Sequence, residues 1–93
     1  MTKVVYISGP IRGVENYHER FDKAAEKLHS EGYIVLKPSV LPKGLTDAQY
    51  MKIDLAMIDC ADCVYFLRGY ERSAGALLEL DYCRYTDKEV LYE

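Results

Sequence analysis

The stretch that decides the fold is VVYISGPIRG, which occupies residues 4–13. Its first four residues, 4–7, form a short apolar run rich in β-branched side chains. The Ser-Gly-Pro cluster at 8–10 then breaks any regular structure. This pattern predicts a buried β-strand over residues 4–7 that is followed at once by a loop.

The loop after this strand is a candidate ligand site. Gly9 and Gly13 allow backbone amides to approach a ligand closely, and Arg12 offers a planar cation to a phosphate or carboxylate. A plain turn with a surface arginine is the alternative. The glycine spacing does not match the fingerprint of dinucleotide-binding folds.

The rest of the chain alternates between helical and strand patterns. Apolar periodicity, capping residues and breakers predict helices over about 16–31, 46–61 and 73–85, and strands over 33–36, 63–67 and 89–92. The first two helices are expected to begin with capping boxes, formed by Asn16 with Glu19 and by Thr46 with Gln49. Strands that alternate with helices pair in parallel through right-handed crossovers. We therefore expect an α/β fold, a minimal doubly wound (Rossmann- or flavodoxin-like) parallel sheet of about four strands with three main helices. We expect residues 1–93 to form one domain.

Composition excludes several classes of protein. The 93 residues are 49% hydrophobic and 29% charged, which is ordinary for a globular domain. The net charge of −3 argues against a protein that binds nucleic acid polymers. No apolar run approaches the roughly 18 residues that span a bilayer, so we expect no membrane partner.

The three cysteines point to a reduced compartment. An odd number of cysteines without a signal-peptide pattern is typical of a cytoplasmic protein. Cys60 and Cys63 have the spacing of a redox or zinc motif, but neither a second pair nor a nearby histidine accompanies them. We expect buried thiols, no metal and no cofactor.

Two acidic residues stand out in the predicted helices. Asp54 shares the apolar stripe of its helix with Tyr50 and Ile58, where an unpaired carboxylate is costly. Glu79 lies inside the third predicted helix, and helical side chains lean toward the helix N-terminus. The alternatives are an aspartate at the edge of the stripe that is bonded to a loop, and a solvated glutamate.

The start of the third predicted helix is a candidate anion site. Ser73 and Gly75 combine a hydroxyl, a small residue and free amides at a helix N-terminus, and an ordinary helix cap is the alternative. In a parallel sheet this end of the helix lies at the same edge as the loop after the first strand. One carboxylate from each of two helices at that edge would form the pair that retaining glycoside chemistry uses.

These motifs together resemble the nucleoside 2-deoxyribosyltransferase-like superfamily. The chain is similar in motif to the 2′-deoxynucleoside 5′-phosphate N-hydrolases and to small bacterial and phage relatives. The resemblance rests on residues 6–13, on Asp54 with Ala61-Asp62 eight residues on, and on Ser73 six residues before Glu79. It covers nearly the whole chain.

The resemblance implies a role for each matching position. Glu79 corresponds to the nucleophile that attacks C1′, Asp54 to the carboxylate that transfers a proton and contacts the base, and Tyr6 to the tyrosine that orients the glutamate or sugar. The substrate- and phosphate-binding positions are implied to be Ser8, Gly9, Arg12, Ser73 and Gly75.

The activity that follows is cleavage or transfer of the N-glycosidic bond of (deoxy)nucleoside 5′-monophosphates through a glutamate nucleophile. It needs no cofactor. We expect a nucleotide or nucleoside as the small-molecule partner, and a homodimer or larger homo-oligomer. The alternative is a non-catalytic nucleotide-binding protein, a sensor or sequestering protein that uses the same pocket. A third reading is a structural or interaction domain with a vestigial site.

Overall fold

The computed structural model describes residues 2–93, and one parallel sheet organises them. The strands are β1 (Val4–Ser8), β2 (Ile34–Leu36), β3 (Cys63–Phe66) and β4 (Glu89–Tyr92). They lie in the order β2-β1-β3-β4, and every neighbouring pair is parallel. The strand order reverses between β1 and β3. The predicted doubly wound parallel sheet is confirmed.

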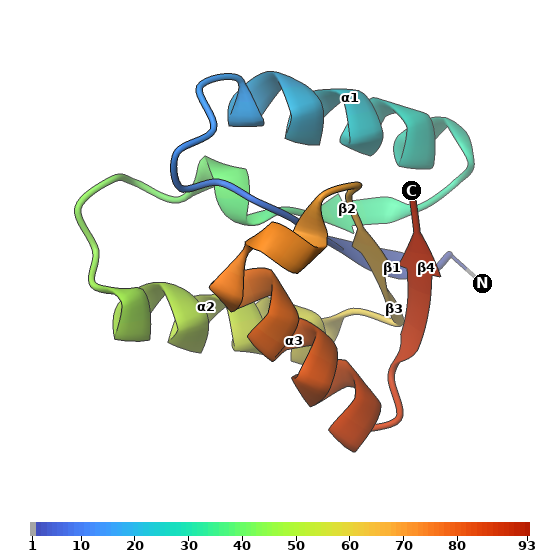
Figure 1. The fold of residues 1–93 in the computed structure, drawn as a ribbon. Helices are drawn as coiled ribbons and strands as arrows, with labels where there is room; N and C mark the ends of the chain where they lie inside the picture. The colour runs from blue at the N-terminus through green and yellow to red at the C-terminus, as the bar shows by residue number, and fades with distance from the viewer. Residues whose placement is uncertain (1) are drawn as a thin grey trace.

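Helices cover both faces of the sheet (Figure 1). The helix α1 (Tyr17–Ser30) lies on one face, and α2 (Asp47–Cys60) and α3 (Ala74–Tyr85) lie on the other. Two single 3₁₀ turns, η1 (Pro38–Val40) and η2 (Tyr70–Arg72), interrupt the loops. The predicted helices are confirmed to within a residue or two at their ends.

Side-chain alternation along β1 separates two cores. Val5 and Ile7 point to the α1 side, where Phe21 and Leu28 cover them. The other core contains Tyr6, together with Ile58 of α2, Leu80 of α3 and the inner strand residues Val64 and Phe66. The strand also extends one residue beyond the predicted end, to Ser8. Ser8 therefore projects to the same face as Tyr6, toward α2 and α3.

The first residues of α1 and α2 differ in whether the predicted capping hydrogen bonds form. Thr46 accepts a hydrogen bond from the amide of Gln49, and the Gln49 side chain accepts one from the amide of Thr46, so the capping box predicted for α2 is confirmed. The capping box predicted at Asn16 is wrong. Its backbone lies outside the extended region that a cap requires, and its side chain makes no capping hydrogen bond.

The cysteine prediction holds for two of the three residues. Cys63 and Cys83 are buried thiols, whereas Cys60 is exposed, because it is the last residue of α2 and lies outside both cores. Among residues 2–93, no helix combines the length and apolarity that crossing a membrane requires.

Candidate active site

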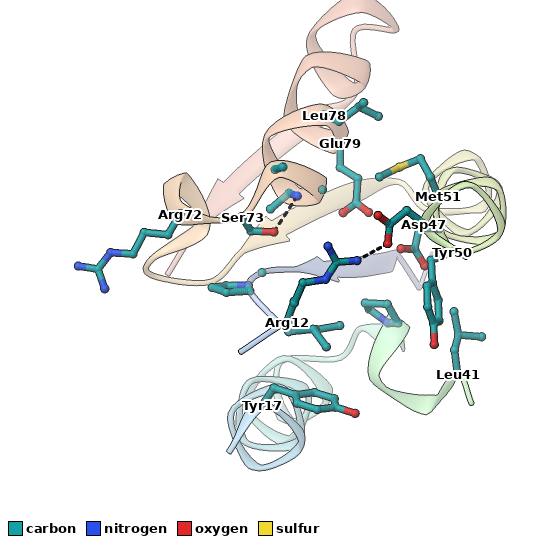
Figure 2. Close-up of a pocket in the computed structure, with 18 of the residues that line it drawn as sticks. Arg12, Tyr17, Leu41, Asp47, Tyr50, Met51, Arg72, Ser73, Leu78 and Glu79 are labelled. Atoms are coloured by element: carbon teal, nitrogen blue, oxygen red, sulfur yellow. Dashed lines mark hydrogen bonds and ion pairs between the residues drawn. The ribbon is translucent and has the colours of Figure 1, made fainter. Parts of the chain in front are cut away.

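A pocket of about 870 Å³ opens beyond the carboxyl end of β1. Its walls come from the loop after β1, from the first two turns of α2 and from the start of α3 (Figure 2). This position, beside the point where the strand order reverses, is where open parallel sheets bind their ligands. The volume suits a small organic molecule.

Glu79 is the central acidic group of the pocket. It is only 4% exposed, and both of its carboxylate oxygens accept hydrogen bonds from β1. The Ser8 hydroxyl donates to Oε1 over 2.7 Å, and the Tyr6 hydroxyl donates to Oε2 over 3.3 Å. Alternation along β1 places these two donors on one face, and the backward lean of helical side chains aims Glu79 at them.

Ser8 lies in a different place from the one expected for a substrate-binding residue. It is fully buried, it does not line the pocket, and its hydroxyl is turned to Glu79. The reason is the one-residue extension of β1, which moves Ser8 from the loop into the strand. Its contact with the glutamate fixes that carboxyl group.

Asp54 is the second buried carboxyl group in the same pocket. It is 8% exposed, it projects from the inner face of α2, and its Oδ1 atom has no hydrogen-bond partner among residues 2–93. A buried acceptor without a partner is rare in folded proteins, and it marks a position where a ligand can donate a hydrogen bond.

Burial dominates the acidity of both groups. Desolvation, together with the nearby charge of Asp54, raises the pKa of Glu79 to about 8 against the lowering effect of the Ser8 hydrogen bond. Desolvation likewise raises the pKa of Asp54 to about 6. Between these two values the pair holds one proton and one negative charge. Burial, with the charge of Glu79 next in size, also raises the pKa of Tyr6, so its hydroxyl remains a donor at neutral pH.

The start of α3 forms one wall of the pocket. Ser73 caps the helix by accepting a hydrogen bond from the amide of Ala76 over 3.1 Å. This leaves its hydroxyl proton free to donate, and the first-turn amides of α3 have no partner within the helix. Gly75 follows at the second position of the helix and also lines the pocket.

The two predicted glycines differ in what surrounds them. A Cβ atom at Gly9 would lie 2.9 Å from Cβ of Leu67, so any side chain there would displace the buried core. A Cβ atom at Gly75 would meet only ordinary contacts, of 3.7 Å to Met51 and 3.9 Å to Ser73. Packing therefore requires a glycine at position 9, but it does not at position 75.

Arg12 reaches across the mouth of the pocket to Asp47 in the first turn of α2 (Figure 2). Both side chains are largely exposed and both line the pocket. Asp47 is absent from the sequence-predicted site. Its spacing offered a signal, because residues 47, 50, 51 and 54 share one face of a helix, and all four line the pocket.

The structure thus brings together most of the predicted site. Tyr6, Gly9, Arg12, Asp54, Ser73, Gly75 and Glu79 all line one pocket. Within residues 2–93, no group of three or more histidine, cysteine or acidic side chains is arranged to hold a metal ion.

Comparison with solved structures gives the same fold twice. A 2-deoxyribosyltransferase from the psychrotolerant bacterium Bacillus psychrosaccharolyticus aligns with a TM-score of 0.76 and 24% identity, over 96% of this chain and 70% of that one. A 2-deoxyribosyltransferase from Leishmania mexicana aligns with a TM-score of 0.77 and 20% identity, over 97% of this chain and 63% of that one. The fold implied by the sequence resemblance is confirmed.

Sequence comparison places the chain in a family. No protein of curated function matches it significantly. Residues 3–92 match the family described as a domain of unknown function, DUF4406. Since this match covers nearly every residue, the chain belongs to the DUF4406 family, and in this chain the family has the fold of the 2-deoxyribosyltransferases.

Proposed function

We propose that the pocket cleaves or transfers the N-glycosidic bond of (deoxy)nucleoside 5′-monophosphates, with Glu79 as the nucleophile. One observation carries the proposal: Glu79 is buried in a pocket, two hydroxyl groups hold its oxygens, and a second buried carboxyl group lies beside it. A glutamate of this kind is costly for folding and is typical of a catalytic site. The shared fold of two proteins named as 2-deoxyribosyltransferases supports the same chemistry.

The chemistry has two steps that balance. In the first, a Glu79 oxygen attacks C1′ of the sugar, and the bond from C1′ to the base nitrogen breaks. The electron pair leaves with the base, to which Asp54 gives its proton. In the second, water or another base attacks C1′, Asp54 accepts the proton of the attacking group, and the ester bond to Glu79 breaks.

The first step needs a charged Glu79 and a protonated Asp54. The hydrogen bonds from Ser8 and Tyr6 favour the negative charge on Glu79, because a charged acceptor binds these donors more strongly. Without substrate the higher pKa, that of Glu79, keeps the proton of the pair on Glu79, so the proton has to pass to Asp54 when the substrate binds. We infer that Ser8 and Tyr6 are positioning residues that stabilise the charge on Glu79 when the proton passes to Asp54 in the substrate complex.

The 5′-phosphate is proposed to lie against the start of α3. The Ser73 hydroxyl and the amides of Ala74 and Gly75 can donate to phosphate oxygens there, and the helix dipole favours a negative charge. Arg12 is one of three cationic residues that line the same pocket, with Lys43 and Arg72, and it can bind the phosphate if it gives up its contact with Asp47. The missing side chain at Gly75 allows close approach.

A nucleotide-binding protein without turnover is the second candidate. The observation that favours it is the raised pKa of Glu79, since a carboxyl group that is protonated near neutral pH is a weak nucleophile. In that reading the same pocket holds the nucleotide as a signal or stores it.

The two readings are separated by a product assay. Wild type, Glu79→Gln and the control Glu26→Gln are incubated with the four deoxynucleoside 5′-monophosphates, and free base is measured by liquid chromatography with mass spectrometry. Glu26 is exposed on α1, so the control makes the same chemical change outside the pocket. We expect base release by wild type and the control only.

Other outcomes decide against the proposal. Release that persists in Glu79→Gln would exclude a glutamate nucleophile. Nucleotides that remain intact but raise the thermal midpoint of wild type would favour the binding protein. If no base is released and the nucleotides cause no thermal shift, both candidate functions are excluded.

A further inference from the structure

A second hollow of about 450 Å³ lies beside the pocket, and arginines dominate its lining. Arg20 of α1, Arg68 after β3 and Arg72 of η2 contribute the cations, and Glu71 is the single acidic residue of the lining. None of these residues takes part in the chemistry proposed above. Three like charges around one depression are unfavourable unless an anion balances them.

Neighbouring acidic residues balance only part of this charge. The Arg20 guanidinium lies 3.6 Å from the Glu93 carboxylate and also donates to the Arg68 carbonyl oxygen over 2.8 Å. These contacts hold Arg20 in place. Within residues 2–93, the side chains of Arg68 and Arg72 form no ion pair and remain exposed.

The second hollow adjoins the pocket at its phosphate end. Arg72 lines both depressions, and it directly precedes Ser73, the cap of α3. Figure 2 shows the Arg72 side chain extending away from Glu79 and out of the pocket. Pro10 of the pocket and Gly69 of the second hollow face each other across this boundary.

Gly69 lies at the boundary between the two depressions. Its φ angle of +92° is one that side chains rarely adopt, and a Cβ atom there would lie 3.8 Å from Cγ of Pro10. Because position 69 carries no side chain, this residue leaves the space beside Pro10 unfilled.

We propose that the second hollow binds the phosphates beyond the first one of a nucleoside 5′-polyphosphate. The protein then binds a nucleoside 5′-diphosphate or triphosphate more tightly than the 5′-monophosphate of the proposed reaction. The first phosphate lies at Ser73, and the outer phosphates meet Arg72, Arg68 and Arg20. Arginine suits this task because its planar group binds two phosphate oxygens at once. The inference rests on the proposed function, since it takes the first phosphate to lie at the start of α3.

The test compares affinities for ligands that differ only in phosphate number. Isothermal titration calorimetry measures the dissociation constants of a deoxynucleoside 5′-mono-, di- and triphosphate for Glu79→Gln, and for the same variant with Arg68→Gln or Arg68→Gln/Arg72→Gln added. Glu79→Gln is the background throughout, so that no ligand is consumed, and EDTA keeps the phosphates free of metal. Arg84→Gln, at an exposed position in the last turn of α3, is the matched control.

We expect the diphosphate to bind about tenfold more tightly than the monophosphate, which is the gain typical of one added charged hydrogen-bonding contact. We expect the ratio of the monophosphate to the diphosphate dissociation constant to decrease in Arg68→Gln and to come closer to one in the double variant. Arg84→Gln should leave this ratio unchanged. Thermal midpoints without ligand confirm that each variant is folded.

Three results would overturn the inference. Equal affinity of the Glu79→Gln background for mono- and diphosphates would overturn it and leave the proposed function standing. A diphosphate preference that survives both arginine variants would place the outer phosphate elsewhere. No binding of any nucleotide would refute the proposed function itself, and the inference with it.

Discussion

Replacing Glu79 by glutamine should stabilise the protein at alkaline pH. Burial raises the pKa of this carboxyl group from 4.5 to about 8. The folded protein therefore holds a proton that the unfolded chain has already lost, and the contribution of Glu79 to stability is full below pH 4.5. It falls as the pH rises toward 8. Each pKa unit corresponds to about 1.4 kcal/mol, which gives an upper limit of about 5 kcal/mol.

The expected loss is smaller than this limit, because the charge of Asp54 contributes to the shift and the pocket admits water. We expect the free energy of unfolding of wild type to fall by about 2 kcal/mol between pH 5 and pH 8 through Glu79. Glutamine mimics the protonated carboxyl group and carries no charge. Glu79→Gln should therefore match wild type near pH 5 and exceed it by about 2 kcal/mol at pH 8.

Chemical denaturation at several pH values measures this difference, and thermal scans should show it as a rise of roughly 10 °C in the midpoint at pH 8. Glu26→Gln, exposed on α1, should differ from wild type by the same small amount at every pH. The reasoning is refuted if Glu79→Gln differs from wild type equally at pH 5 and pH 8, or is the less stable of the two at pH 8.

Two further predictions concern the neighbours of Glu79. Asp54→Asn should slow base release about 10²- to 10⁴-fold, because it removes the proton donor. The pH–rate profile of wild type should have its two limbs near the pKa values of the pair, about 6 and about 8. Asp54→Asn should abolish the alkaline limb. An unchanged profile would remove Asp54 from the mechanism. Gly75→Ala should leave the protein as stable or stabilise it by about 0.5–1 kcal/mol, since its Cβ fits and alanine favours a helix. The same variant should weaken monophosphate binding in calorimetry, and unaltered affinity would place the phosphate away from α3.

The sequence predicts the architecture well because its signals are local and consistent. The apolar run at 4–7 and the breakers after it define β1, and the box of Thr46 and Gln49 fixes the start of α2. The alternation of strands and helices then leaves few topologies. Asn16 shows the limit of such signals, because a residue of the right type makes no cap when its backbone does not adopt the required conformation.

The site was predictable where one strand or one helix decides a side chain's direction. Asp54 and Glu79 project into the pocket as their helical positions indicate. The contact between Ser8 and Glu79 was not predictable, because it depends on β1 continuing by one residue. The pairing of Arg12 with Asp47 joins a loop to a helix 35 positions away, and no local pattern encodes that distance.

The central claim is that Glu79 bonds to C1′ of the substrate. Its most direct test is a single-turnover reaction of wild type with a deoxynucleoside 5′-phosphate that is quenched in acid and analysed by intact-protein mass spectrometry and peptide fragmentation. The account predicts that base release is accompanied by a transient mass increase of one deoxyribose phosphate on the peptide that contains Glu79, and that Glu79→Gln shows neither. An adduct on a different side chain, or base release at the wild-type rate by Glu79→Gln, would contradict the account.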